Sequence, residues 1–284
     1  MPFPHNNFCH YEPIEKRIKA ARVLVVDSLL RNEKDLSHVA LEELGRTVSI
    51  EIQRERKIAS LAVENILNNI ERLVKKPETR VSHVTEIAAA AREFQPDAIV
   101  LSGTLRDFDY YRPGIIDSFS SFMRETRTPV LGICGGHQMV GLSFSARVIT
   151  LDNHEQHERR IGRPFEYQYR FIRITDPVDP IFRGIADDKK SRILRVWQNH
   201  GLQLDRVPEG FKLLATAYLC RIQMMVKRTD GQLIYTVQFH LEKSFEDWNK
   251  NRTRWEHRNA SRDGRIIFEN FLRLALKHKA DVRG

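Results

Sequence analysis

Short apolar runs alternate with longer amphipathic stretches along the first half of the chain. The apolar runs cover residues 22–27, 97–101 and 129–133. Near-continuous runs of this kind are typical of strands that are buried on both faces of a parallel sheet. The stretches between them carry apolar residues at helical spacing and predict helices. These helices span residues 33–44, 59–75, 85–94 and 115–124. Residues 47–52 alternate apolar and polar side chains, and this period of two predicts a further strand.

The second half of the chain has a different pattern, with several strand-like segments and few helices between them. The predicted strands cover residues 166–175, 192–196, 211–217, 222–226 and 233–239. Residues 264–279 carry apolar side chains at helical spacing and predict a closing helix. We therefore expect an α/β fold, with a mostly parallel central sheet flanked by helices and additional antiparallel strands in the second half.

The composition is that of an ordinary soluble protein, since 41% of the 284 residues are hydrophobic and 29% are charged. The chain has no long uncharged apolar run, and its polar, proline-broken start has no signal-peptide character. These features predict a cytoplasmic protein that does not bind membranes. The net charge of +9 favours a solvated basic surface over nucleic-acid binding, because no aromatic-basic nucleic-acid module is visible.

The three cysteines, Cys9, Cys134 and Cys220, are too few and too scattered for a disulfide framework. Cys134 lies in the sequence Gly-Ile-Cys-Gly-Gly-His-Gln, directly after an apolar run. A nucleophile on a tight strand-to-helix turn is lifted clear of the backbone, and the glycines permit such a turn. The dipole of a following helix would favour the thiolate, and the N–H of Gly135 could donate to an oxyanion. A small buried cysteine with no chemical role is the alternative.

His240 and Glu242 follow a predicted strand in the sequence Val-Gln-Phe-His-Leu-Glu. A cysteine hydrolase needs a base that deprotonates the thiol and later protonates the leaving group, and this base needs an orienting carboxylate. In an extended chain, residues two apart point to the same side, so Glu242 can hold the ring of His240. A surface pair is the alternative for this segment alone.

Together, the two segments resemble the class I glutamine amidotransferase family, whose signature is Gly-x-Cys-x-Gly-x-Gln followed by a late His-x-Glu. The resemblance runs from about residue 22 to the final helix, and it implies a flavodoxin-like fold and no cofactor. It further implies a catalytic triad of Cys134, His240 and Glu242 that releases ammonia from the side-chain amide of glutamine. An ammonia-accepting synthase would then be a separate partner.

The resemblance also implies roles for residues around the triad. Gln138 would help to hold the substrate, and a loop at Gly103 and Thr104 would supply the second oxyanion N–H. Thr104 stands where the family usually has a glycine, and a β-branched residue resists positive φ. Leu105 and Leu241 likewise replace the family's usual prolines.

The segment Trp-Gln-Asn-His-Gly at residues 197–201 resembles the glutaminase portion of GMP synthetases, which would place Asn199 and His200 in the wall of the substrate pocket. Leu202 follows in place of that family's usual acidic residue. A turn histidine without contact to the substrate is the alternative for His200. A length of 284 residues leaves no room for the ATP-pyrophosphatase domain of those enzymes.

The predicted domain organisation is an N-terminal extension over residues 1–20 and an amidotransferase domain over 21–284, with insertions near 53–80 and 246–262. Asp152, His154 and His157 could be taken for metal ligands, but no second ligand pair accompanies them, which favours a solvated loop. The same interpretation applies to the three potential ligands near the N-terminus. They are His5, Cys9 and His10.

Two other functions remain open from the sequence. The loop over residues 105–111 carries Arg106, Asp107 and Asp109 close to the predicted site, and it could recognise a γ-glutamyl amide larger than glutamine. The chain could also be a non-catalytic, amidotransferase-like regulatory protein. Its partner surfaces would then be the helix over 59–75 and the basic segment over 248–262.

Overall fold

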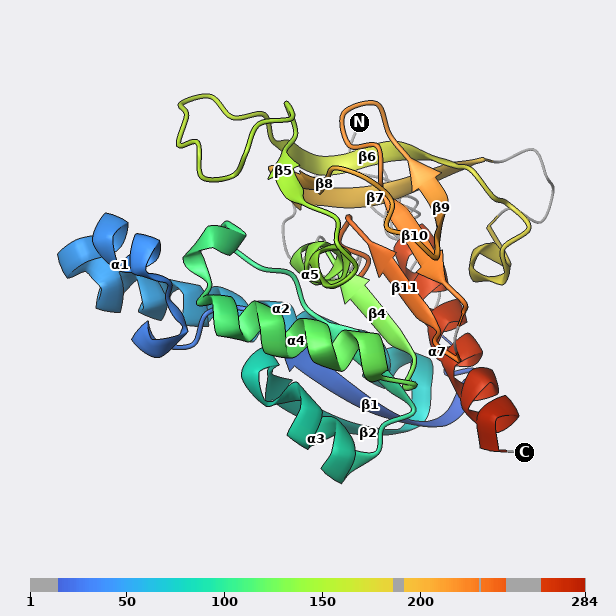
Figure 1. Ribbon diagram of the computed structural model, residues 1–284. Helices are drawn as coiled ribbons and strands as arrows, with labels where there is room; N and C mark the ends of the chain where they lie inside the picture. The colour runs from blue at the N-terminus through green and yellow to red at the C-terminus, as the bar shows by residue number, and fades with distance from the viewer. Residues whose placement is uncertain (1–14, 186–191, 230, 244–261, 284) are drawn as a thin grey trace, which may run out of the picture.

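The computed structural model describes residues 15–185, 192–229, 231–243 and 262–283. A nine-stranded sheet runs through these residues, and its strands change from parallel to antiparallel part-way across (Figure 1). The parallel strands, in spatial order, are β2 (Val74–His83), β1 (Ile18–Asp27), β3 (Ala98–Leu101), β4 (Val130–Ile133) and β11 (Ile234–Val237). The antiparallel strands continue as β10 (Met224–Lys227), β9 (Phe211–Thr216), β6 (Glu166–Ile174) and β7 (Ile193–His200). The predicted fold class is therefore confirmed.

Helices cover both faces of the parallel half, because the side chains of each strand alternate between two hydrophobic cores. Leu24 and Val26 of β1 face one core, and Val23 and Val25 face the other. The first core packs against α1 (His38–Leu44), α3 (Ile87–Phe94), α4 (Pro113–Glu125) and α5 (Gly135–Ser143). The second packs against the later turns of α2 (Val48–Leu73) and against α7 (Arg262–Arg283).

The prediction of a strand over residues 47–52 is wrong, since α2 begins at Val48 and continues for 26 residues. Its buried residues include Val48, Glu55 and Ala59, followed by Ile66 and Ile70, which recur at helical rather than alternate spacing. Ile50 is 54% exposed, so the alternation of apolar residues in this short stretch does not reflect a buried face. The helical spacing of apolar residues over the longer segment 48–73 therefore decides the structure of this stretch.

Two further differences concern the ends and edges of elements. The predicted helix over 33–44 is interrupted at Ser37, whose side chain caps α1 by accepting a hydrogen bond from the N–H of Ala40. The strand β2 was not predicted; it is a polar edge strand that contains Pro77. The separate antiparallel pair formed by β5 (Val148–Thr150) and β8 (Leu202–Leu204) was not predicted either.

The antiparallel strands curl back toward the ends of the parallel strands. The N–H of His240, just after β11, donates to the carbonyl of Trp197 in the edge strand β7 at 2.8 Å. This contact joins two strands that are separated by three others in the order of the sheet. The carboxyl ends of β4 and β11 therefore face β7 across a short gap, and this is where the predicted catalytic residues meet.

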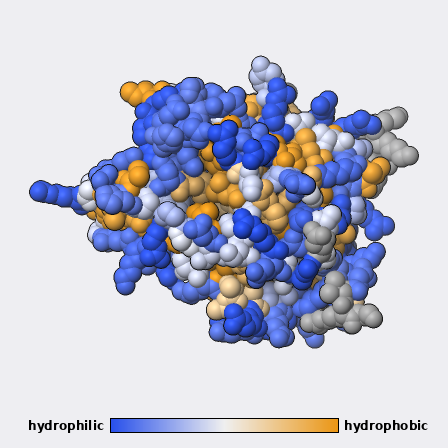
Figure 2. Space-filling view, in the orientation of Figure 1, coloured by the Kyte–Doolittle hydropathy of each residue, from blue (hydrophilic) through white to orange (hydrophobic). Residues whose placement is uncertain are grey.

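The surface is predominantly hydrophilic on the face shown in Figure 2, with hydrophobic side chains emerging in separate patches. Among the helices of the described residues, none combines the length and the apolar character that crossing a membrane requires. The predicted insertion at residues 53–80 comprises most of α2 and the first part of β2. The predicted insertion at 246–262 lies outside the described residues except for Arg262, as does the N-terminal extension up to residue 14.

Candidate active site

Cys134 occupies the single residue between β4 and α5, and its backbone takes the unusual angles φ 49° and ψ −106°. Such angles are rare for residues other than glycine, and they cluster at functional sites. A Cβ on Gly132 would lie 2.8 Å from the carbonyl oxygen of Gly136, so only glycine fits there. The turn is anchored by the N–H of Cys134, which donates to the carbonyl of Val237 at 2.8 Å. The predicted strand–turn–helix context of Cys134 is present.

His240 and Glu242 lie beside Cys134, and Nδ1 of His240 is 2.7 Å from Oε1 of Glu242. The other ring nitrogen, Nε2, is buried and has no hydrogen-bond partner among the described residues. Burial disfavours the charged imidazolium, but the charges of Glu242 and Cys134 outweigh that effect and raise the pKa of His240 well above its ordinary value. The arrangement favours a protonated His240 beside Cys134.

The loop after β3 closes the site from a third side. A Cβ on Gly103 would lie 3.4 Å from both Cβ of Cys134 and Cε1 of His240. A Cβ on Gly135 would lie 2.3 Å from the backbone nitrogen of Thr104. Thr104 does not take a positive φ, so its β-branched side chain meets no conformational obstacle. Gly135 opens α5, and its N–H therefore has no partner within the helix and remains free to donate.

A family model for glutamine amidotransferase class-I matches residues 61–258. The chain belongs to this family. The match includes the turn at Cys134 and the segment with His240 and Glu242.

The amidotransferase is similar to subunits of glutamine-hydrolyzing GMP synthase. The one from Thermococcus kodakarensis is 33% identical over 151 residues, which are 53% of this chain and 69% of the relative. The one from Methanosarcina acetivorans is 31% identical over 164 residues, covering 58% of this chain and 73% of the relative. The amidotransferase matches only 26% of the length of the glutamine-hydrolyzing GMP synthase of Lacticaseibacillus casei, at 30% identity over 56% of this chain.

Solved structures share the fold of the amidotransferase. A glutamine amidotransferase from Thermotoga maritima superimposes with a TM-score of 0.53 at 16% identity, covering 90% of this chain and 98% of that one. A glutamine amidotransferase from Methylobacillus flagellatus gives a TM-score of 0.53 at 12% identity, covering 92% of this chain and 95% of that one. These likenesses agree with the mostly parallel sheet and its flanking helices.

The three residues predicted to bind substrate occupy different positions in the amidotransferase. Asn199 is exposed at the end of β7, and its carbonyl oxygen lies 4.0 Å from Sγ of Cys134. His200 is buried, with Nδ1 2.9 Å from the carbonyl of Leu202 and Nε2 3.1 Å from Glu166. Gln138 is also buried, and its amide nitrogen donates to that same carbonyl at 3.0 Å. Asn199 therefore borders the site, while the other two side chains lie beneath it.

Sequence reasoning did not identify two side chains that contact the triad. Gln238 is fully buried, and its amide nitrogen lies 3.7 Å from Sγ of Cys134. It is two residues before His240, so the same spacing argument that pointed to Glu242 could have pointed to it as well. Asn69 of α2 donates to the carbonyl of Glu242 at 2.8 Å. No local pattern indicated Asn69, because 173 residues separate the two in sequence.

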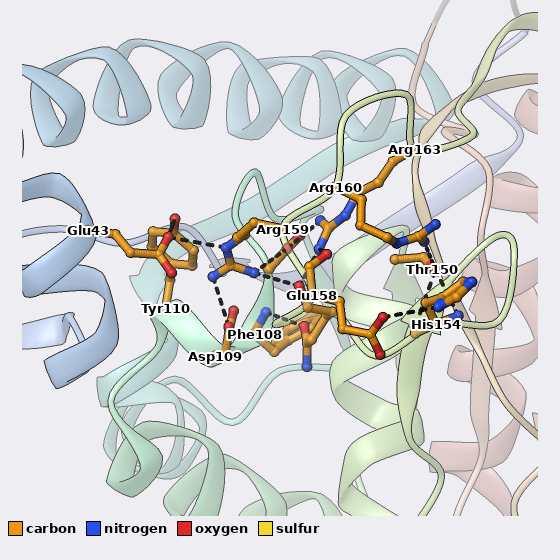
Figure 3. Close-up of polar contacts among 12 residues, drawn as sticks. Glu43, Phe108, Asp109, Tyr110, Thr150, His154, Glu158, Arg159, Arg160 and Arg163 are labelled. Carbon is orange, nitrogen blue, oxygen red and sulfur yellow. Dashed lines mark hydrogen bonds and ion pairs between the residues drawn. The ribbon is translucent and has the colours of Figure 1, made fainter.

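Two of the residues weighed as metal ligands, His154 and Asp152, are held in other interactions, and His157 is exposed. Nδ1 of His154 lies 3.0 Å from Glu158, and Asp152 pairs with Arg160 at 2.8 Å (Figure 3). Within the described ranges, no group of three or more potential ligands comes together to hold a metal ion. His5, Cys9 and His10 lie outside the described residues.

Proposed function

We propose that the chain hydrolyses the side-chain amide of glutamine through a thioester on Cys134, with His240 as acid and base and Glu242 as its orienting partner. The observation that carries the proposal is the joint geometry of these three residues. Glu242 binds Nδ1 of His240 at 2.7 Å, which leaves Nε2 for the cysteine side of the site. Cys134 stands on a strained strand-to-helix turn that presents its thiol there.

The reaction follows from these positions. The Cys134 thiolate attacks the amide carbon of glutamine, and the electron pair of the carbonyl bond moves to its oxygen. The N–H groups of Gly135 and of the Gly103–Thr104 loop stabilise this oxyanion. Protonated His240 gives its proton to the amide nitrogen, the carbon–nitrogen bond breaks, and ammonia leaves. Neutral His240 then takes a proton from water, the hydroxide attacks the thioester, and glutamate leaves as the carbon–sulfur bond breaks.

The names of the relatives support a use for the ammonia. This chain covers 69% and 73% of the length of two relatives that are named as subunits of glutamine-hydrolyzing GMP synthase. We propose by analogy that the ammonia released by this chain passes to a separate synthase partner. The chain would act in the cytoplasm, where such a partner and glutamine are both at hand.

The structure gives less support to a larger γ-glutamyl substrate. Arg106, Asp107 and Asp109 carry the charges that made the 105–111 loop a candidate recognition site. Arg106 is paired with Glu51 and Glu55, and both aspartates are paired with Arg159. Because these side chains are already in ion pairs within the protein, they are poorly placed to bind a charged substrate.

A substrate panel with acid-quenched mass spectrometry tests the proposal. Wild-type protein mixed with glutamine and quenched in acid is expected to carry a glutamyl adduct on the peptide that contains Cys134. γ-Glutamyl amides with bulky amine groups should give less adduct than glutamine. An adduct formed only with the bulky amides would contradict the proposed substrate, and an adduct on another residue would contradict the proposed nucleophile.

A further inference from the structure

The loop that lines the oxyanion site is tied to α2 by a buried ion pair. Arg106 lies two residues after Thr104, and its Nε is 3.1 Å from Glu55 while its Nη2 is 2.6 Å from Glu51. The side chain of Glu55 is 1% exposed, and its other carboxylate oxygen accepts a hydrogen bond from the N–H of Leu30 at 2.9 Å. Arg106 is itself only 19% exposed. These contacts hold Arg106 against α2 and tie Glu55 to the segment that follows β1.

The following residues of the same loop are held from the opposite side by the segment 152–163 (Figure 3). Arg159 lies 3.1 Å from Asp107 and 2.8 Å from Asp109, and it also pairs with Glu43 of α1 at 3.1 Å. The side chain of Gln156 accepts a hydrogen bond from the N–H of Phe108 at 2.7 Å. The loop is therefore held at both ends, by the ion pairs of Arg106 with α2 and by the ion pairs of Arg159 with Asp107 and Asp109, which restrict its movement.

Small movements of this loop would reach the reacting atoms. A Cβ on Gly103 would already be in van der Waals contact with Cys134 and His240, and a Cβ on Gly135 would clash with Thr104. An oxyanion donor works only when its N–H points at the position that the oxygen will occupy. A displacement of about 1 Å at such a site lowers the rate by roughly 10²-fold.

We propose that Arg106 is a positioning residue, which through Glu55 and Glu51 of α2 sets the placement of the Gly103–Thr104 backbone over Cys134. α2 would then serve the site at two points, because Asn69 of the same helix binds the carbonyl of Glu242. The inference rests on the proposed function. The region predicted as an insertion, residues 53–80, would then hold both the Gly103–Thr104 loop and Glu242.

The test compares Arg106→Gln with wild type and with Arg54→Gln in ammonia release from glutamine. Arg54 is a matched control, because it also pairs with Glu51, at 2.6 Å, but is 69% exposed. We expect Arg106→Gln to lower kcat by roughly 10- to 10²-fold, with KM close to that of wild type. Arg54→Gln should retain the wild-type kcat.

A second measurement separates positioning from a merely structural role. Alkylation of Cys134 by iodoacetamide needs the thiolate but no oxyanion, so its rate in Arg106→Gln should equal that in wild type. If alkylation falls together with kcat, Arg106 supports the nucleophile or the fold, and the inference is wrong. If Arg106→Gln does not fold, Glu51→Gln takes its place, because Glu51 is 22% exposed whereas Glu55 is 1% exposed. This variant should show a smaller fall in kcat with unchanged alkylation.

The failures of the two proposals are distinguishable. An unchanged kcat in Arg106→Gln and Glu51→Gln, with wild-type activity that is lost in Cys134→Ala, overturns the role of Arg106 alone. Activity that persists in Cys134→Ala overturns the proposed function, and the inference about Arg106 falls with it.

Discussion

Gly135 is packed so closely against Thr104 that the site has no room for a side chain at this position. An added Cβ would lie 2.3 Å from the nitrogen of Thr104 and 2.1 Å from its Oγ1, and backbone cannot move aside as a flexible side-chain end can. Gly135→Ala should therefore displace the oxyanion loop and lower kcat by about 10²-fold or more. Steady-state ammonia release checks this expectation. Gly114→Ala is the control, since a Cβ there meets nothing within 4 Å, and equal losses in both variants would refute the argument.

Under the proposed function, His240 and Glu242 determine how activity depends on pH. Because the charges of Glu242 and Cys134 raise the pKa of His240 despite its burial, the imidazolium persists above the ordinary value of 6.5. The loss of activity at alkaline pH, where the proton for the leaving ammonia is no longer available, should thus begin well above that value. Glu242→Gln removes the raising charge and should move this limb to lower pH. A profile of kcat/KM against pH that keeps its alkaline limb in Glu242→Gln would contradict this assignment.

The proximity of Cys134, His240 and Glu242 could be predicted from the sequence, because each lies in a short segment with a distinctive pattern. Cys134 follows an apolar run and precedes two glycines, and His240 and Glu242 are two residues apart. Gln238 and Asn69 contact the same groups without such marks, since a glutamine or asparagine has many ordinary roles in a protein. Tertiary contacts, and not residue type, bring these amides to the triad.

Helix α2 shows how an element at the side of the sheet can stabilise the site. Asn69 is 3% exposed and donates to the carbonyl of Glu242, so Asn69→Ala leaves a buried carbonyl without this partner. We expect the free energy of unfolding to fall by about 1–3 kcal/mol. Denaturant unfolding of Asn69→Ala and Asn68→Ala tests this, because Asn68 is only half-buried on the same helix. An equal loss of stability in both variants would show that the bond to Glu242 is not the cause.

The elements that the sequence predicted well are those with long or strongly apolar patterns. The strands at 97–101 and 129–133 and the helices at 85–94 and 115–124 are present within a few residues of the expected bounds. The prediction for residues 47–52 was wrong because six residues are too few to distinguish the period of a strand from the period of a helix. β2 was missed because it is largely exposed at the edge of the sheet, where polar side chains are tolerated.

The curl of the whole sheet could not be foreseen. It brings Trp197 of β7 against His240, and the order of nine strands that makes this contact is set by pairings between residues far apart in the chain. Hydrophobic patterns specify which face of a strand is buried but not which strand lies next to it. The alternation of apolar runs and amphipathic stretches predicted the fold class, and the structure adds the way in which β7 closes over the carboxyl ends of β4 and β11.

Whether Cys134 is the nucleophile is decided by ammonia release from glutamine, measured on the purified wild-type chain, Cys134→Ala and Cys220→Ala. Cys220 is the matched control, because it is a fully buried cysteine whose thiol contacts the carbonyl of Ile222. Our prediction is that wild type and Cys220→Ala release ammonia, whereas Cys134→Ala keeps its fold and releases none. Release that continues in Cys134→Ala would contradict it.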